Sequence, residues 1–471
     1  MDFTLNNTSD RPIVIIGAGV SGLVLSILLK KLQKNILIIE KRPPFQSNKL
    51  EDPRSFNMTI SERGMKCFRK IGVEKRILEC AVPIKNRIIH LPISHSISQN
   101  RIVQSYGKEK EDIIFSIKRS DLIRILYEES SKNKNTKMIF DSELVDVNKN
   151  GSSLTVRSRL TNQELIMPFS LLIGADGGYS KTREFVLSGQ LIDFQVKYFK
   201  WIYKKFSFSS VDARMLKIDP CSLHIFPQHN STIFAIPNQD QSFSSIYCCD
   251  INGLSDIRSS EAHKYVESKF IEDFPQLFDL SNTIRGTLND SKIGGLLNVH
   301  LSKWSCEDKI ILIGDAAHAV FPFYGQGMNA ALQDCQVLAS LLVSEKNNFE
   351  ALSKYETIQK TSVSALSDLC ASHFYYLSQK SLSPICEAQR LIDNILKKLK
   401  IFTWHSEYNL VAQTEIPYNK ISEIIRKQNT IRKLLGIVLF DYFFGLFIFF
   451  KRKVSNLFVK SKKTIQLRLN I

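Results

Sequence analysis

The chain has 471 residues, of which 44% are hydrophobic and 23% are charged. This composition excludes a disordered or fibrous protein, and the length predicts about two or three domains. The net charge of +17 is unevenly spread, because residues 419–471 hold twelve Lys and Arg against two acids, which gives 12 − 2 = +10. The other 418 residues carry 17 − 10 = +7. The charge therefore favours a basic C-terminal segment over a nucleic-acid-binding surface.

Nine cysteines are present, without a CxxC pair or a metal-binding spacing. An odd number of cysteines in this arrangement predicts free thiols in a reduced compartment and no metal site. The first residues lack a basic stretch followed by a long apolar one, so we expect no secretory signal.

The N-terminal part contains a pattern typical of dinucleotide binding. A short apolar run, 12–16, leads directly into Gly17-Ala18-Gly19-Val20-Ser21-Gly22. The Leu-rich stretch 23–32 has helical length, and 36–40 has the composition of a second buried strand. The order of strand, glycine-rich turn, helix and strand is much more specific than the glycines alone.

The glycines and the acid at the end of the second strand have distinct expected roles. Gly17 permits the tight turn, Gly19 lets the backbone approach a pyrophosphate, and Gly22 lets the helix pack against the strand. Glu40 follows Gly22 by 40 − 22 = 18 residues, where a carboxylate can accept a hydrogen bond from a ribose 2′-OH. An acid here disfavours a 2′-phosphate, so we predict bound FAD or NAD; the alternative is a purely structural turn.

Two later motifs favour FAD. One apolar run leads into Asp176-Gly177, and another leads into Gly314-Asp315. Each acid can accept a hydrogen bond from a ribityl hydroxyl, although either dipeptide alone is a common turn. The glycine-rich stretch 322–329 opens an expected helix over 330–342 and can present N–H groups to the carbonyl edge of a flavin.

Longer stretches carry a resemblance to the FAD-dependent aromatic hydroxylases, the group of p-hydroxybenzoate hydroxylase, and within it to the kynurenine 3-monooxygenase family. They are Arg54–Gly64, Val82–His90, Ser105-Tyr106-Gly107, Phe115–Arg119 and Ser367-Asp368-Leu369. The resemblance covers roughly residues 11–435 and is weakest over 186–300, where Leu223–Pro227 is similar.

The resemblance implies an α/β fold with an FAD-binding Rossmann-like domain of the p-hydroxybenzoate hydroxylase type, an antiparallel β substrate domain, C-terminal helices and a membrane-anchor helix. We expect the FAD domain in two parts, 1–185 and 290–370, and the substrate-domain sheet over 186–289. The C-terminal regions would be a helical part that closes the active site, a membrane-anchor segment and a basic tail, over 371–430, 431–453 and 454–471.

The resemblance also assigns cofactor contacts. It places Ser21 at the pyrophosphate turn, Asp315 at the ribityl and phosphate region, and Met328 with Asn329 at the isoalloxazine. The adenosine ribose and the rest of the cofactor would contact Glu40, Lys41, Arg42, Thr59, Arg119, Leu144 and Lys181. As alternatives, Arg119 could flank a helix cap, Leu144 could belong to the core, and Lys181 could be solvated.

For the substrate, the resemblance implies that Arg87, Tyr106 and Tyr408 hold the amino-acid part of kynurenine. A guanidinium can bind a carboxylate through two parallel hydrogen bonds. The sequence departs from the family at two positions, where His373 replaces an Asn and Leu377 a Met. His373 can still donate to a carboxylate; alternatively it is an exposed helix residue.

The segment 434–450 is apolar apart from Asp441 and is flanked by basic residues. Its 450 − 434 + 1 = 17 residues lie at the lower limit for spanning a bilayer. A central acid costs about 2.5–3.5 kcal/mol, which the apolar neighbours can outweigh. We expect a membrane anchor, with an interfacial helix or a buried helix as alternatives. The resemblance implies a catalytic domain facing the cytosol, on the mitochondrial outer membrane if the source is eukaryotic.

The activity implied is that of a monooxygenase without a catalytic side chain. NADPH, bound transiently, would reduce FAD; O₂ would then give a C4a-hydroperoxyflavin that transfers oxygen to an aromatic ring. The expected reaction converts L-kynurenine to 3-hydroxykynurenine in tryptophan catabolism, toward pyridine nucleotides. Alternatives are another aromatic acid as substrate, a flavin-binding membrane protein without activity, and an epoxidase or reductase acting on an isoprenoid. Partners would be the small substrate and a membrane, not nucleic acid.

Overall fold

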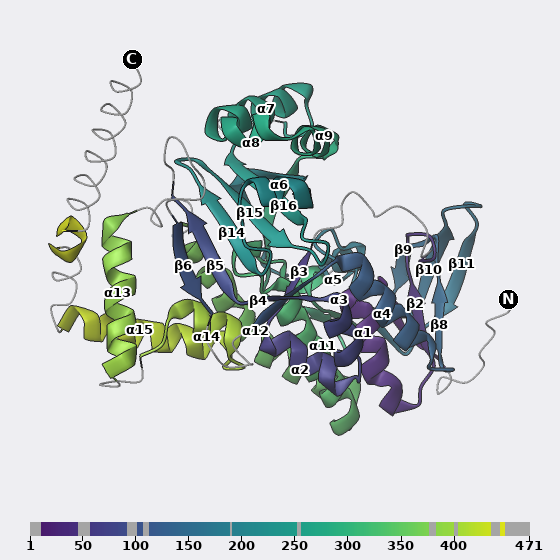
Figure 1. Ribbon diagram of the computed structural model, residues 1–471. Helices are drawn as coiled ribbons and strands as arrows, with labels where there is room; N and C mark the ends of the chain where they lie inside the picture. The colour runs from purple at the N-terminus through teal and green to yellow at the C-terminus, as the bar shows by residue number, and fades with distance from the viewer. Residues whose placement is uncertain are drawn as a thin grey trace, which may run out of the picture.

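A computed structural model of the chain describes residues 11–45, 57–91, 101–106, 113–188, 191–251, 256–375, 383–399, 404–434 and 443–447 (Figure 1). Residues 54–56, Gly107 and Leu377 of the motifs above lie outside the described residues, as does the basic tail.

A six-stranded sheet forms the centre of the first unit. Its order is β18-β19-β12-β1-β2-β8, and all neighbours pair in parallel except β18 with β19. The strands are β1 (Ile13–Ile16), β2 (Ile36–Ile39), β8 (Thr136–Ile139), β12 (Leu171–Gly174), β18 (Ser305–Cys306) and β19 (Ile310–Leu312). Most of these strands are runs of aliphatic residues without alternation, because a parallel sheet is covered on both faces.

Helices cover this sheet and tie its two sequence parts together. The chain after β1 enters α1 (Val20–Leu28), which packs against α4 (Arg119–Ser131) and α11 (Gly327–Ser344). The remaining local elements are η2 (Leu29–Leu32), α2 (Glu62–Lys70), α3 (Glu74–Cys80), α5 (Lys181–Leu187), α10 (Asp315–His318) and η4 (Pro322–Tyr324). Strands from before 185 and after 290 thus share one sheet and one hydrophobic core.

A seven-stranded sheet in the order β17-β13-β16-β15-β14-β5-β6 forms the second unit. Its strands are β5 (Asn86–His90), β6 (Arg101–Ser105), β13 (Phe194–Phe208), β14 (Ser222–Pro227), β15 (Ser231–Pro237), β16 (Phe243–Asp250) and β17 (Gly294–Leu301). All neighbours are antiparallel except β14 with β5. The sheet extends beyond the predicted range 186–289, because it takes in β5, β6 and β17.

Smaller elements surround the two sheets. Figure 1 shows a helical cap on the seven-stranded sheet, made of α6 (Ser210–Met215), α7 (Ser260–Asp273), α8 (Pro275–Leu280) and α9 (Asn282–Asp290). Two three-stranded sheets contain β3 (Met58–Ile60), β7 (Ile114–Ile117) and β4 (Val82–Ile84), and β9 (Ser142–Asn148), β10 (Ser153–Ser158) and β11 (Glu164–Pro168).

The C-terminal part is helical where it is described. The long helix α12 (Asn348–Tyr375) packs against α15 (Tyr418–Leu434). The helices α13 (Pro384–Leu399) and α14 (Glu407–Gln413) lie beside α15 (Figure 1). A second core cluster packs the helices α12, α14 and α15 against η4 and the seven-stranded sheet.

The expected membrane anchor is tested only in part. None of the helices in the described residues is both long enough and apolar enough to cross a bilayer. Of the segment 434–450, only Leu434 and 443–447 belong to those residues.

Candidate active site

The glycine-rich turn has the geometry of an open phosphate cradle. Gly17 has φ +104°, a region that L side chains rarely adopt, and a Cβ there would lie 2.6 Å from the Ala175 carbonyl oxygen. A Cβ on Gly19 would meet nothing within 4 Å, and no side chain caps α1. There is thus room beside Gly19 at the uncapped start of α1, which fits a diphosphate.

Glu40 lies beside this turn but already has protein partners. Its carboxylate accepts from Ala18 N at 2.8 Å and from Nε of Arg42 at 2.8 Å. Burial would raise the pKa of Glu40, but the hydrogen bonds and charge of Arg42 outweigh it, and the pKa is lowered. A ribose hydroxyl would have to share this carboxylate with Arg42, whose side chain is 41% exposed. Lys41 is exposed.

The two motif acids differ in availability. Asp176 accepts from Ser180 Oγ at 2.6 Å and Thr182 N at 3.0 Å, so it holds the start of α5. The Asp315 side chain is accessible to solvent, but many protein atoms lie around it. Their presence removes water from the carboxyl and raises its pKa, while the charges of His318 and Arg119 act to lower this pKa. The structure thus brings Arg119, at the start of α4, near Asp315, as expected if both contact one cofactor.

The side chain of Asn329 has a structural role. Its Nδ2 donates to Thr59 O at 3.0 Å and to Gly325 O at 2.9 Å, and its Oδ1 accepts from Ser61 N at 3.1 Å. Thr59 Oγ1 also donates to Gly325 O, at 3.1 Å. These bonds lock β3 to the start of α11, where no side chain caps the helix. Contact of Asn329 with a flavin is therefore left to its backbone, next to the half-buried Met328.

The remaining predicted cofactor residues divide between core and surface. Ser21 on α1 faces Gly314, since its Oγ is 2.9 Å from where a Cβ on Gly314 would lie. Leu144 on β9 is 6% exposed and belongs to the main core. Lys181 is exposed and pairs with Glu184 at 2.5 Å. Within the described part of the chain, Lys181 forms no hydrogen bond with another predicted cofactor residue, so its contact with the cofactor stays a prediction beside the alternative of a solvated side chain.

The four predicted substrate residues meet in one cluster, which we call the Arg87 cluster: Arg87 (β5), Tyr106 (after β6), His373 (α12) and Tyr408 (α14). Nη1 of Arg87 lies 3.2 Å from Nε2 of His373, and the guanidinium carbon lies 4.4 Å from the ring centroid of Tyr408. The Tyr106 and Tyr408 rings stack with centroids 5.1 Å apart. His373 is therefore buried within the cluster and is not an exposed helix residue.

The electrostatics of the cluster favour an anionic ligand. Arg87 is 6% exposed, and Gln104 accepts its Nε and Nη2 at 3.0 and 2.6 Å. No carboxylate among the described residues lies within 4.0 Å of this guanidinium. Burial, together with the charge of Arg87, holds the pKa of His373 well below its usual value, so His373 is neutral and cannot supply a second cation. The buried Tyr106 hydroxyl has no hydrogen-bond partner within normal geometry.

The sequence patterns missed three residues of this site. Gln104 faces Arg87 in the β5–β6 register, a pairing that only the fold reveals. Tyr324 stacks on His373 with ring centroids 4.0 Å apart, and its hydroxyl donates to Glu407 Oε1 at 2.6 Å. Tyr324 and Glu407 could have been found from the sequence, since Tyr324 lies within the glycine-rich stretch and Glu407 directly precedes Tyr408.

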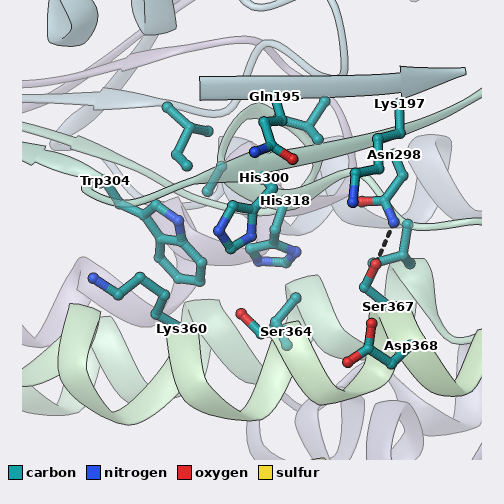
Figure 2. A pocket seen from close by; sticks show the side chains of 15 residues that line it. Gln195, Lys197, Asn298, His300, Trp304, His318, Lys360, Ser364, Ser367 and Asp368 are labelled. Atoms are coloured by element: carbon teal, nitrogen blue, oxygen red, sulfur yellow. Dashed lines mark hydrogen bonds between the residues drawn. The ribbon is translucent and has the colours of Figure 1, made fainter. Parts of the chain in front are cut away.

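A separate cavity of about 260 Å³ lies between the strands β13 and β17 and the helix α12. Figure 2 shows Ser364, Ser367 and Asp368 on the helix wall, with Gln195, Lys197, Asn298 and His300 opposite. The motif Ser367-Asp368 thus lines this cavity and not the Arg87 cluster; Ser367 accepts a hydrogen bond from Asn298.

Comparisons with known proteins show the family of the chain. The family model described as FAD binding domain matches residues 10–368. Kynurenine 3-monooxygenase of Salinispora tropica is 27% identical over 433 residues, 92% of this chain and 94% of the relative. The enzyme of the same name from Dictyostelium discoideum is 29% identical over 431 residues, 89% of this chain and 90% of the relative.

Solved structures share the fold. A tetrameric form of 2-methyl-3-hydroxypyridine-5-carboxylic acid oxygenase superposes with a TM-score of 0.62 at 18% identity, covering 86% of this chain and 97% of the other. A variant of Klebsiella pneumoniae HpxO, complexed with FAD, gives 0.62 at 16% identity, covering 83% and 98%. The chain therefore belongs to the FAD-binding domain family and is an FAD-dependent monooxygenase similar to the kynurenine 3-monooxygenases.

Proposed function

We propose that this enzyme hydroxylates L-kynurenine to 3-hydroxykynurenine with NADPH and O₂ as co-substrates. The carrying observation is the Arg87 guanidinium, which among the described residues is buried without a carboxylate partner, next to the unpartnered hydroxyl of Tyr106. A buried charge of this kind is costly unless an opposite charge joins it. The carboxylate of an amino-acid substrate supplies that charge.

The residues of the chain divide the work between binding and positioning. Gln104 fixes two nitrogens of Arg87, which orients the guanidinium for a bidentate carboxylate contact. Tyr106 donates its free hydroxyl to the same carboxylate, and Tyr408 stacks over the guanidinium on one side. Anchoring the amino-acid end in this way leaves the aromatic ring of the substrate to extend toward the start of α11.

The cofactor side supplies the redox chemistry. When bound, FAD would supply the transfer of electrons from NADPH and the activation of O₂, which the protein side chains cannot do. The open turn at Gly19, the acids Glu40 and Asp315, and the uncapped start of α11 are the groups that would hold it. The buried aromatic residues around η4 and α12 exclude water from the substrate ring.

The direct test is product formation by the FAD-loaded protein. We expect L-kynurenine to stimulate NADPH oxidation and 3-hydroxykynurenine to accumulate. A protein that binds FAD but shows neither effect with kynurenine would contradict the proposal. Stimulation by a different aromatic acid would support the alternative substrate, which the neutral His373 against Arg87 makes worth testing.

We also propose that 434–450 attaches the enzyme to a membrane. In the described part of this segment, Phe443 and Phe447 are 67% and 62% exposed, and exposed aromatic side chains favour the lipid–water interface. Sedimentation with anionic vesicles tests this: the full chain should sediment, a chain ending at residue 433 should not, and equal behaviour of both would contradict it.

A further inference from the structure

A carboxyl group, that of Glu407, lies next to the Arg87 cluster in the chain and is linked to it through Tyr324. Glu407 begins α14 directly before Tyr408, and the Tyr324 hydroxyl donates to its Oε1 at 2.6 Å. No Lys, Arg or His nitrogen among the described residues lies within 4.0 Å of this carboxylate. A half-buried carboxylate with one neutral donor is incompletely compensated, so the site has a position for a cation.

Arg87 and Glu407 are linked through other side chains but form no ion pair with each other. Arg87 contacts His373 at 3.2 Å, His373 stacks on Tyr324 at 4.0 Å, and Tyr324 bonds Glu407. Arg87 and Glu407 are not within 4.0 Å of each other. Burial raises the pKa of the Tyr324 hydroxyl most, Glu407 raises it further, and Arg87 opposes this, so both charges lie close to the same phenol.

We infer, resting on the proposed function, that Glu407 is a specificity-determining residue that receives the α-ammonium group of a zwitterionic aromatic substrate. In this arrangement Arg87 binds the α-carboxylate, Glu407 binds the α-ammonium, and Tyr324 holds the Glu407 carboxylate in place. The site thereby selects amino acids over aromatic acids that have the same ring and carboxylate but lack the amino group.

A structural role is the rival explanation, since Glu407 could serve only to hold Tyr324 or to start α14. Glu407→Gln separates the two, because the amide oxygen can still accept from Tyr324 while the negative charge is gone. Tyr324→Phe is the matched control: it removes the hydroxyl but keeps the ring that stacks on His373 and leaves the Glu407 charge.

The experiment measures dissociation constants from the flavin absorbance of the FAD-loaded full chain. The ligands are three pairs, each an amino acid and its counterpart without the amino group: L-kynurenine with 4-(2-aminophenyl)-4-oxobutanoate, L-tryptophan with indole-3-propionate, and L-phenylalanine with 3-phenylpropionate. For every amino acid that binds, Glu407→Gln should weaken binding about ten- to hundredfold, the value of one charged hydrogen bond. Binding of the counterpart should change by less than about twofold, and Tyr324→Phe should have the smaller effect on the amino acid.

The outcomes separate this inference from the proposed function. Equal effects of Glu407→Gln on both members of a pair, or no effect on either, overturn the inference while kynurenine binding leaves the proposed function intact. Selective loss of another amino acid, with no kynurenine binding, supports the inference and contradicts the proposed function. Binding of none of the six ligands overturns both.

Discussion

The cofactor side and the substrate side of this enzyme are built in different ways. The turn after β1, with Gly17, Gly19 and the nearby Glu40, is formed within about thirty consecutive residues of a strand–helix–strand unit. The Arg87 cluster draws its members from β5, the residue after β6, α12 and α14, which are brought together by tertiary packing. The first site is therefore encoded in local sequence, whereas the second depends on how separate parts of the chain meet.

The largest expected effect separates substrate binding from cofactor binding. Arg87→Ala should lower kcat/KM for L-kynurenine by about a hundred- to a thousandfold, because it removes the buried cation that faces the carboxylate and leaves that group unpaired. The FAD dissociation constant should stay unchanged. Steady-state kinetics and flavin titration measure both, and Arg157→Ala, which removes an exposed ion pair with Glu164, is the control.

A substitution in the glycine-rich turn tests the cofactor side in the same way. Gly19→Val places a side chain in open space, so the fold should persist, yet FAD affinity should fall about a hundredfold because the diphosphate would occupy that space. Gly286→Ala also adds a Cβ with nothing within 4 Å, but in α9, and should leave FAD affinity unchanged. Equal FAD affinity of Gly19→Val and the native chain would show that the cofactor lies elsewhere.

Buried histidines give the two sides opposite pH responses. In the seven-stranded sheet, burial lowers the pKa of His224 to about 4, below 6.5, so the folded state binds fewer protons than the unfolded state in this window. The free energy of unfolding should therefore fall as pH drops, by about 2–3 kcal/mol for this group between pH 7.5 and 4.5.

On the nucleotide side, burial opposes protonation of His318, but Asp334 outweighs it and raises the pKa. The contribution of His318 to the free energy of unfolding is present at low pH and is lost as pH rises through its pKa in the folded state. Urea unfolding of the native chain and of the His224→Gln variant, at pH 7.5 and pH 4.5, measures the pH dependence of the free energy of unfolding. The variant should lose much of the acid sensitivity, and an unchanged pH dependence would contradict the assignment to His224.

The smallest expected effect tests a residue that the resemblance assigned to the cofactor. Lys181→Ala should change the FAD dissociation constant by less than about twofold, because Lys181 is exposed and pairs with Glu184, and such pairs contribute little. Flavin titration measures this directly. A tenfold loss of affinity would show that Lys181 turns toward the cofactor instead of Glu184.

The sequence predicted those features that depend on local pattern. The β1–α1–β2 unit was predicted from periodicity and glycines, with the first helix beginning at Val20 instead of Leu23. The convergence of Arg87, Tyr106, His373 and Tyr408 was predicted only through family resemblance, since no periodicity joins four distant segments. The partners Gln104, Tyr324 and Glu407 were missed, because strand register and packing of α14 against η4 are set by the tertiary fold.

One measurement tests the central claim most directly: the rate at which NADPH reduces the bound flavin without oxygen, with and without L-kynurenine, followed by admission of O₂. The proposed function predicts faster reduction with kynurenine and one 3-hydroxykynurenine formed per flavin reoxidised. An unchanged reduction rate together with no hydroxylated product would contradict it.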